Sequence, residues 1–165
     1  MTTLKSIIIL FPIITLVLAG ILYFYILKKA TNKKDFNKFV FTMTVLAFLL
    51  NFTWELIQIP FYKGSSYSIV HITFCALASV ADAIMVLLLY FGVSFIFRTF
   101  FCLQHVKWKR IVIVILTGGT GAVLSEIRDL SLGSWAYADS MPIIPIVNIG
   151  ISPVLQCMIL PYWSI

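Results

Sequence analysis

Two stripes of polar side chains interrupt long apolar segments of this sequence. The first lies in "NFTWELIQIPFY", residues 51–62, and the second begins at His71. Ionisable side chains are costly inside a membrane and usually mark a site or a pathway. Members of each stripe recur every three or four residues, on one face of a helix: Asn51, Glu55, Gln58 and Tyr62, then His71, Cys75, Ser79 and Asp82. Both stripes are therefore expected to face the protein interior.

The acids of these stripes favour acid–base chemistry on a hydrophobic substrate. A protonated carboxylic acid in an apolar pocket can protonate an alkene, an epoxide or another weakly basic group. A second, ionised carboxylate can remove a proton or stabilise a carbocation. We expect Glu55 to be the acid and Asp82 its partner, with Glu126 as a third catalytic candidate.

Other polar and aromatic side chains are expected to shape the pocket, in part because aromatic rings attract cationic species. The substrate-binding candidates are Asn51, Trp54, Gln58, Tyr62, His71, Trp135 and Tyr137. Structural alternatives remain open for them. The amides can serve as hydrogen-bonding glue between helices. The histidine can simply be solvated, and the aromatic residues of the loop can form an interfacial belt.

The composition of the chain is that of a membrane protein. Of its 165 residues, 61% are hydrophobic and 11% are charged, whereas about a quarter of the residues in a soluble domain are charged. A helical span needs roughly 20 apolar residues, and the segments of that length are 5–27, 39–61, 68–97, 110–130 and 143–163. We expect one all-α domain over residues 1–165, a polytopic membrane helix bundle of about five transmembrane helices.

Basic residues set the expected orientation. The loop after the first span holds Lys28, Lys29, Lys33, Lys34 and Lys38, and the loop after the third holds Arg98, Lys107, Lys109 and Arg110. Basic loops are usually cytoplasmic, which puts the N-terminus outside, the C-terminus in the cytoplasm and the acids in the outer half. Topology thus explains the net charge of +6, and no nucleic-acid partner is expected.

Two segments depart from a regular helix pattern. The fifth span contains Pro142, Pro145, Pro153 and Pro161, so we expect this last helix to be broken by prolines, which membranes tolerate where protein or water satisfies the freed backbone groups. The run "TGGTG" at 117–121 either loosens the fourth span or lets another backbone approach it closely.

The stretch "LLNFTWELI" resembles the membrane-integral terpene cyclases of meroterpenoid pathways, which share an NxxWE motif near the end of an early span. The resemblance implies an isoprenoid substrate and assigns to Glu55 the acid that starts cyclisation. Those enzymes are longer, and their second acid lies in a late span that this chain lacks. "ELIQIPFY" resembles the ExxxQxPxF of sterol-isomerase-like and sigma-receptor-like membrane proteins, with one residue fewer between Glu and Gln.

The combined pattern, NxxWExxQxPxY followed by WAY and a proline-rich segment, resembles small bacterial multi-span membrane proteins of no assigned function. This resemblance implies a multi-pass protein of the bacterial inner membrane. The expected partners are the lipid bilayer and a hydrophobic small molecule, and no oligomeric state is assigned.

Several rival functions stay open. A metal site could draw on His71, Cys75, Asp82, Glu55 and Glu126, but an HExxH motif and a histidine-rich cluster are both missing, so no metal and no cofactor are expected. A proton-coupled carrier could use the same acids. However, "AIMVLLLYFGVSFIF" after Asp82 holds no polar relay. A lipid-binding subunit and an immunity-like or assembly protein are further alternatives.

Overall fold

The computed structural model describes residues 2–97 and 108–164, with side chains described for 13–97, 108–109 and 111–164. The described chain is helical apart from its loops and one short hairpin. Its elements are α1 (Thr2–Lys29), α2 (Lys33–Gln58), the 3₁₀-helix η1 (Ile59–Phe61), α3 (Ile69–Phe97), α4 (Trp108–Ser131), β1 (Ile143–Ile144), β2 (Ile149–Gly150) and α5 (Ile151–Ser164).

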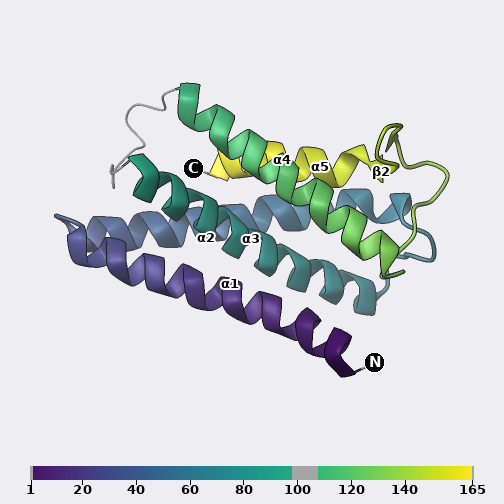
Figure 1. Cartoon of the computed structure of the whole chain (residues 1–165), viewed down its shortest axis with the longest axis horizontal. Helices are drawn as coiled ribbons and strands as arrows, with labels where there is room; N and C mark the ends of the chain where they lie inside the picture. The colour runs from purple at the N-terminus through teal and green to yellow at the C-terminus, as the bar shows by residue number, and fades with distance from the viewer. Residues whose placement is uncertain (1, 98–107, 165) are drawn as a thin grey trace.

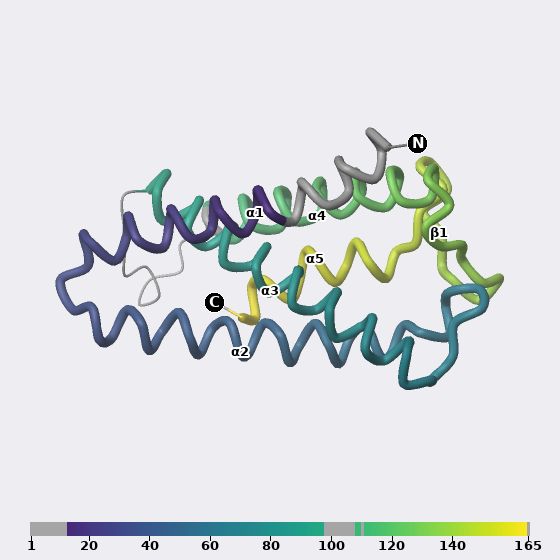
Figure 2. Tube along the Cα trace, turned by 90° about the horizontal axis from the view of Figure 1, so that it is seen from below, coloured from purple at the N-terminus to yellow at the C-terminus, as the bar shows by residue number. Residues whose placement is uncertain are grey.

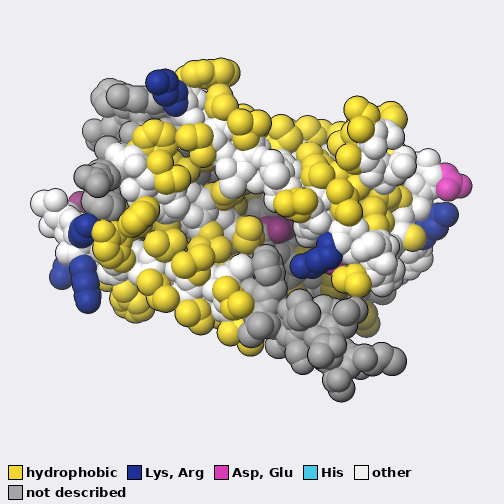
Figure 3. Space-filling view, in the orientation of Figure 1, with side chains coloured by type: hydrophobic (Ala, Val, Ile, Leu, Met, Phe, Trp, Pro, Cys, Tyr) yellow, Lys and Arg dark blue, Asp and Glu magenta, His cyan; other side chains and the backbone are white. Residues whose placement is uncertain are grey.

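Within the described residues, three helices are long and apolar enough to cross a membrane. They are Lys33–Phe61, Ile69–Phe97 and Ile111–Ser131. Large apolar side chains lie on their outer surfaces, for example Phe41, Leu77 and Leu124, and hydrophobic side chains are spread widely over the face shown in Figure 3. Such an exterior is stable in hydrocarbon and unfavourable in water, which indicates a membrane protein.

The helices run roughly along one common direction (Figures 1 and 2). α2 packs along α3, and α4 packs along α5. α5 also contacts α2 and so joins the two pairs, while α1 lies mainly against α3. The turn between α1 and α2 lies at one end of the bundle, and the hairpin and the α2–α3 connection lie together at the other end (Figure 1). The latter is called the hairpin end below.

The sequence accounts for both ends of α2. The side-chain oxygen of Asn32 accepts hydrogen bonds from the backbone N–H groups of Lys34 and Asp35, which caps the start of the helix. At the other end Pro60 has no N–H group to continue the helical ladder, and the chain leaves through η1. Glu55 therefore lies about one turn before a well-defined helix end.

An apolar core fills the bundle near the α1–α2 turn. Its buried members come from three helices: Ile26 of α1, Phe36, Val40 and Met43 of α2, and Tyr90 and Phe91 of α3. A smaller cluster of Ala47, Ala83 and Val86 continues it toward the middle of the bundle. Apart from the buried hydroxyl of Ser94, the described interior is thus mainly apolar at this end, and the acids lie toward the hairpin end.

The expected fifth span, 143–163, is helical only in its second part. Residues 143–150 form an antiparallel hairpin in which Ile143 pairs with Gly150 and Ile144 with Ile149. Asn148 adopts φ 53° in its turn, a left-handed conformation that asparagine tolerates. α5 then continues through Pro161. The expected break therefore takes the form of a hairpin over the proline-containing first part, which lacks N–H groups that a helix needs, and only the second part is helical.

The glycine run of α4 serves close packing. A Cβ atom on Gly118 would lie 2.1 Å from the backbone oxygen of Cys157 in α5, and one on Gly119 would lie 3.0 Å from the side chain of Met158. Side chains larger than hydrogen would separate the two helices. Of the two expected roles for "TGGTG", the close approach of another backbone is the one observed.

Candidate functional site

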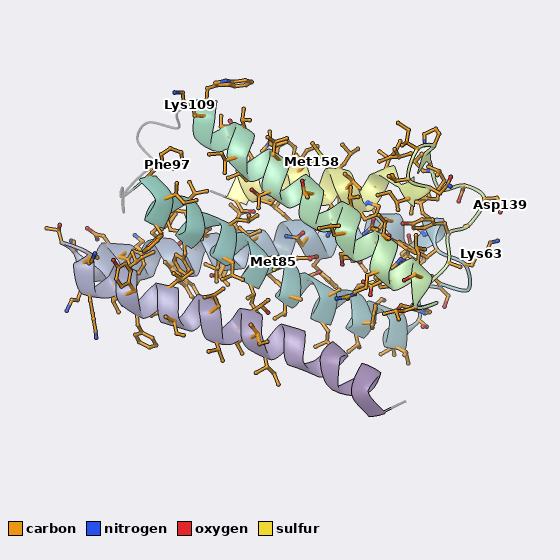
Figure 4. All side chains as sticks on the ribbon, viewed as in Figure 1. Lys63, Met85, Phe97, Lys109, Asp139 and Met158 are labelled. Carbon is orange, nitrogen blue, oxygen red and sulfur yellow. The ribbon has the colours of Figure 1, made fainter. Side chains whose placement is uncertain are left out.

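A cavity of about 530 Å³ lies between α2, α3, α4 and α5 toward the hairpin end. Each of the four helices contributes polar side chains to its wall: Glu55 and Gln58, His71 and Asp82, Glu126, and Gln156. Figure 4 shows Lys63 and Asp139 at the hairpin end of the molecule and Phe97 and Lys109 at the opposite end. Both polar stripes face inward, since Asn51, Gln58, Cys75 and Ser79 are buried.

The side-chain amide of Gln156 in α5 is the centre of the polar interior. Its Nε2 atom lies 3.2 Å from Oε1 of Glu55 and 3.1 Å from Oδ2 of Asp82. The same nitrogen lies 3.1 Å from Oδ1 of Asn51. A primary amide has two hydrogens, so these acceptors share one donor group. The two carboxyls come from separate helices and meet at this nitrogen.

Neighbouring side chains determine which way the Gln156 amide points. Gln58 donates a hydrogen bond from Nε2 to the Oε1 atom of Gln156 at 2.9 Å, and Ser152 donates to Oε1 of Gln58 at 3.0 Å. With its oxygen engaged by a donor, the Gln156 amide turns its NH₂ group toward the acids. The chain of donors from Ser152 through Gln58 thus gives the cavity a fixed polarity, with donors directed at the carboxyls.

Glu126 of α4 lies apart from this amide and is bound by the loop that follows its helix. Its Oε2 atom accepts hydrogen bonds from the Tyr137 hydroxyl and from Nε1 of Trp135, the latter at 3.3 Å. Gly133, with φ 68°, ends α4 and turns the chain back over the helix. The carboxylate therefore anchors the loop over the cavity, and Glu126 and Trp135 both line it.

The same loop is attached to the end of α2. Lys63 donates its backbone N–H to the oxygen of Ala136 at 2.8 Å, and Ala138 donates to the oxygen of Phe61 at 2.8 Å. The rings of Tyr62 and Tyr137 lie 5.7 Å apart between centroids. Burial raises the pKa of the Tyr137 phenol, as does its hydrogen bond to Glu126. The phenol therefore stays a neutral donor through the physiological pH range.

Most of the residues that sequence reasoning selected lie at this cavity. Those in its wall are Glu55, Asp82, Glu126, Gln58, Tyr62, His71 and Trp135. Asn51, Trp54 and Tyr137 are not among the described residues that line it. Asn51 reaches the acids through Gln156, and Tyr137 holds Glu126. The indole nitrogen of Trp54 is buried and has no hydrogen-bond partner in the described part of the chain.

Gln156 is the important site residue that sequence reasoning did not select. In the sequence, Gln156 is a lone amide in the apolar stretch "ISPVLQCMILP". Such an amide is explained equally well by hydrogen bonding between packed helices. For a metal, His71 and Cys75 were considered beside the acids. Over residues 13–97 and 108–164, no three His, Cys, Asp or Glu side chains come together as a ligand set.

Comparison of the chain with models of known protein families, with curated proteins and with solved structures found no match. Its function is therefore inferred from the geometry and the chemistry of the cavity.

Proposed function

We propose that the protein is an integral membrane enzyme that acts on a hydrophobic substrate, an isoprenoid or another lipid, by carboxyl acid–base chemistry. The reaction class is cyclisation or isomerisation. One observation carries the proposal: Glu55 of α2 and Asp82 of α3 both accept from the Gln156 amide in the wall of one cavity. Two carboxyls in one site can divide the roles of proton donor and proton acceptor.

In the proposed reaction Glu55 holds the proton and Asp82 is ionised. Glu55 protonates one carbon of a substrate double bond, and the electrons of that bond form the new C–H bond. Asp82 then removes a proton from another carbon of the cation, and those electrons form a new double bond. The substrate neither gains nor loses atoms. A proton must return from Asp82 to Glu55 before the next turnover, and their shared position at Gln156 keeps that path short.

The proposed topology places the cavity beneath the outer surface of the membrane. The lysines beside the α1–α2 turn lie at the end opposite the hairpin (Figure 1), and basic loops are usually cytoplasmic. We therefore propose five membrane segments with the N-terminus outside and the C-terminus cytoplasmic. The bacterial inner membrane is proposed from the resemblance to small bacterial membrane proteins. α5, with 14 residues, is shorter than a full span of roughly 20 residues. In this assignment the hairpin forms the outer part of the fifth membrane segment, and α5 forms the rest.

The distribution of polar groups supports an enzyme over a proton-coupled carrier. A carrier needs polar groups or water along a path to the far side. Beyond Asp82 the described interior between α2 and α3 is filled by Ala47, Ala83 and Val86, and then by the cluster around Phe36 and Phe91. A cavity that ends on packed apolar side chains suits a substrate that enters and leaves on the same side.

Substitution of Glu55 by Gln tests the proposal because it removes the transferable proton and keeps the shape. Wild-type protein is extracted gently, and the lipid that co-purifies is identified by native mass spectrometry and followed during incubation. An acid catalyst should lose roughly 10²–10⁴-fold in turnover while it still binds the lipid. Asp35→Asn is the matched control, since Asp35 is an exposed acid outside the cavity.

Two outcomes would contradict the proposal. The first is that wild-type protein leaves every captured lipid unchanged. The second is that Glu55→Gln abolishes proton-dependent flux in vesicles, which would assign the acids to a carrier. A variant that fails to fold is replaced by Asp82→Asn, which removes the proposed proton acceptor.

A further inference from the structure

The wall of the cavity between α3 and α4 is incomplete. α3 packs mainly on α2, and α4 packs mainly on α5, so these two helices contact each other at few positions. On the face shown in Figure 3, an acidic side chain is visible at the bottom of a hollow near the centre of the molecule. The described residues therefore do not close the cavity on this side of the bundle.

The α3 edge of this gap is apolar and exposed. Val70 and Phe74 of α3 line the cavity, yet they are 80% and 60% exposed. Beside them, Leu77 and Val80 of α3 and Leu124 of α4 are exposed on the outer surface. In a membrane this surface contacts lipid chains. An apolar ligand can thus reach the cavity from the bilayer along the apolar edge of α3.

The charges of the cavity select the head of such a ligand. Glu55, Asp82 and Glu126 supply acceptor oxygens. The basic side chains among the described lining residues are His71 and Lys63, and Lys63 is exposed and paired with Asp139 at 3.8 Å. Arg128 of α4 is half exposed and paired with Asp129 at 2.8 Å. A phosphate head would meet like charge, and none of the described lining residues is a buried lysine or arginine that would offset it. An uncharged head with a hydroxyl group can instead donate a hydrogen bond to these carboxyls.

We infer that the cavity takes up an uncharged, hydroxyl-bearing amphiphile directly from the bilayer, through the gap between α3 and α4. The hydroxyl end reaches toward Glu55 and Asp82, and the apolar chain lies against Phe74 and Val70. That this ligand is also the substrate of a reaction rests on the proposed function. The uptake route and the preference for an uncharged head rest on the exposed edge of α3 and on the cavity charges.

Photolabelling in vesicles tests the inference. The protein is reconstituted in phosphatidylcholine vesicles with a polyprenyl alcohol that carries a diazirine, and the labelled peptides are mapped by mass spectrometry after irradiation. Labels should concentrate on α3 and α4 around Phe74, Ala78 and Ser125. Unlabelled polyprenyl alcohol should compete, and the matching polyprenyl phosphate should compete at least about tenfold less well, a difference of about 1.4 kcal/mol.

Two tryptophan substitutions on α3 form a matched pair. Ala78 lines the cavity, whereas Ala81 is exposed and is not among the described lining residues. Ala78→Trp should reduce cavity labelling at least about fivefold by filling the gap, and Ala81→Trp should leave it unchanged. If Ala78→Trp does not fold, Ser125→Trp on the α4 side provides the same obstruction from an exposed position.

Entry from the water side would overturn the inference. In that case Ser134→Trp, at the hairpin end of the cavity, would abolish labelling and Ala78→Trp would not. Equal competition by alcohol and phosphate would also overturn it. Gap-dependent labelling by a wild-type protein that leaves the alcohol and every captured lipid unchanged would retain the inference and reject the proposed function. Loss of turnover in Glu55→Gln without any labelling at the gap would retain the proposed function and reject the inference.

Discussion

Replacement of Gln156 by Leu removes the amide at which the cavity acids meet. The substitution keeps a similar volume but removes the donor that faces Asn51, Glu55 and Asp82, and it removes the acceptor of Gln58. Four hydrogen-bonding contacts are lost together. The groups left behind lie in a largely buried interior, where unpaired polar atoms are costly.

The size of the effect follows from this count. A side-chain hydrogen bond between membrane helices contributes about 0.6 kcal/mol on average and up to about 1.7 kcal/mol. The loss of four contacts should therefore lower the free energy of unfolding by about 2 to 4 kcal/mol. Because Gln58 points the amide toward the acids, Gln58→Leu and Gln156→Leu should be coupled, by about 0.5–3 kcal/mol in a double-mutant cycle.

Reversible unfolding in mixed micelles with increasing denaturing detergent measures this free energy. Leu155→Ala is the control, since Leu155 is exposed on the same helix and lipid replaces its contacts at little cost. If Gln156→Leu is no less stable than this control, or if the two glutamine substitutions are simply additive, the amide does not join the helices as described. Other contacts would then have to hold Glu55 and Asp82 close together.

Two further predictions concern the packing and the loop. Gly118→Ala should lower the free energy of unfolding by about 1–3 kcal/mol because its Cβ meets the Cys157 backbone oxygen at 2.1 Å; Gly121→Ala, with nothing within 4 Å, should be neutral or stabilising in the same unfolding assay. Burial raises the pKa of the Tyr137 phenol above its usual value near 10, so its contribution to stability is present below about pH 10 and lost as the pH rises further. An alkaline unfolding series should show a shallower decline for Tyr137→Phe; an unchanged slope would contradict the buried phenol.

The helices and their polar faces could be predicted from local pattern. The spacing of Asn51, Glu55 and Gln58 places them on one side of any α-helix, and their cost in hydrocarbon turns that side inward. The ends of α2 follow from Asn32 and Pro60. The expected spans 39–61, 68–97 and 110–130 accordingly agree with the long apolar helices of the structure to within a few residues at most ends.

The fifth segment could not be predicted in the same way, because its composition allows more than one structure. Apolar residues with several prolines fit a broken helix, and residues 143–150 instead pair as a hairpin that turns at Asn148. Which of these forms depends on contacts between the two flanks of the segment. Ile151 donates its backbone N–H to Pro142, and Met141 packs against Gly150.

The sequence by itself determined a helical, membrane-type chain whose acids turn inward, because hydropathy and helical period are properties of neighbouring residues. Only the tertiary structure decided that Glu55 and Asp82 meet, and that they meet at Gln156. Those residues are joined across 101 and 74 positions of the chain, and a contact at such separation depends on how whole helices pack. α5 packs against α2 as well as α4 and also contacts α3, and this packing brings the Gln156 amide to the two carboxyls.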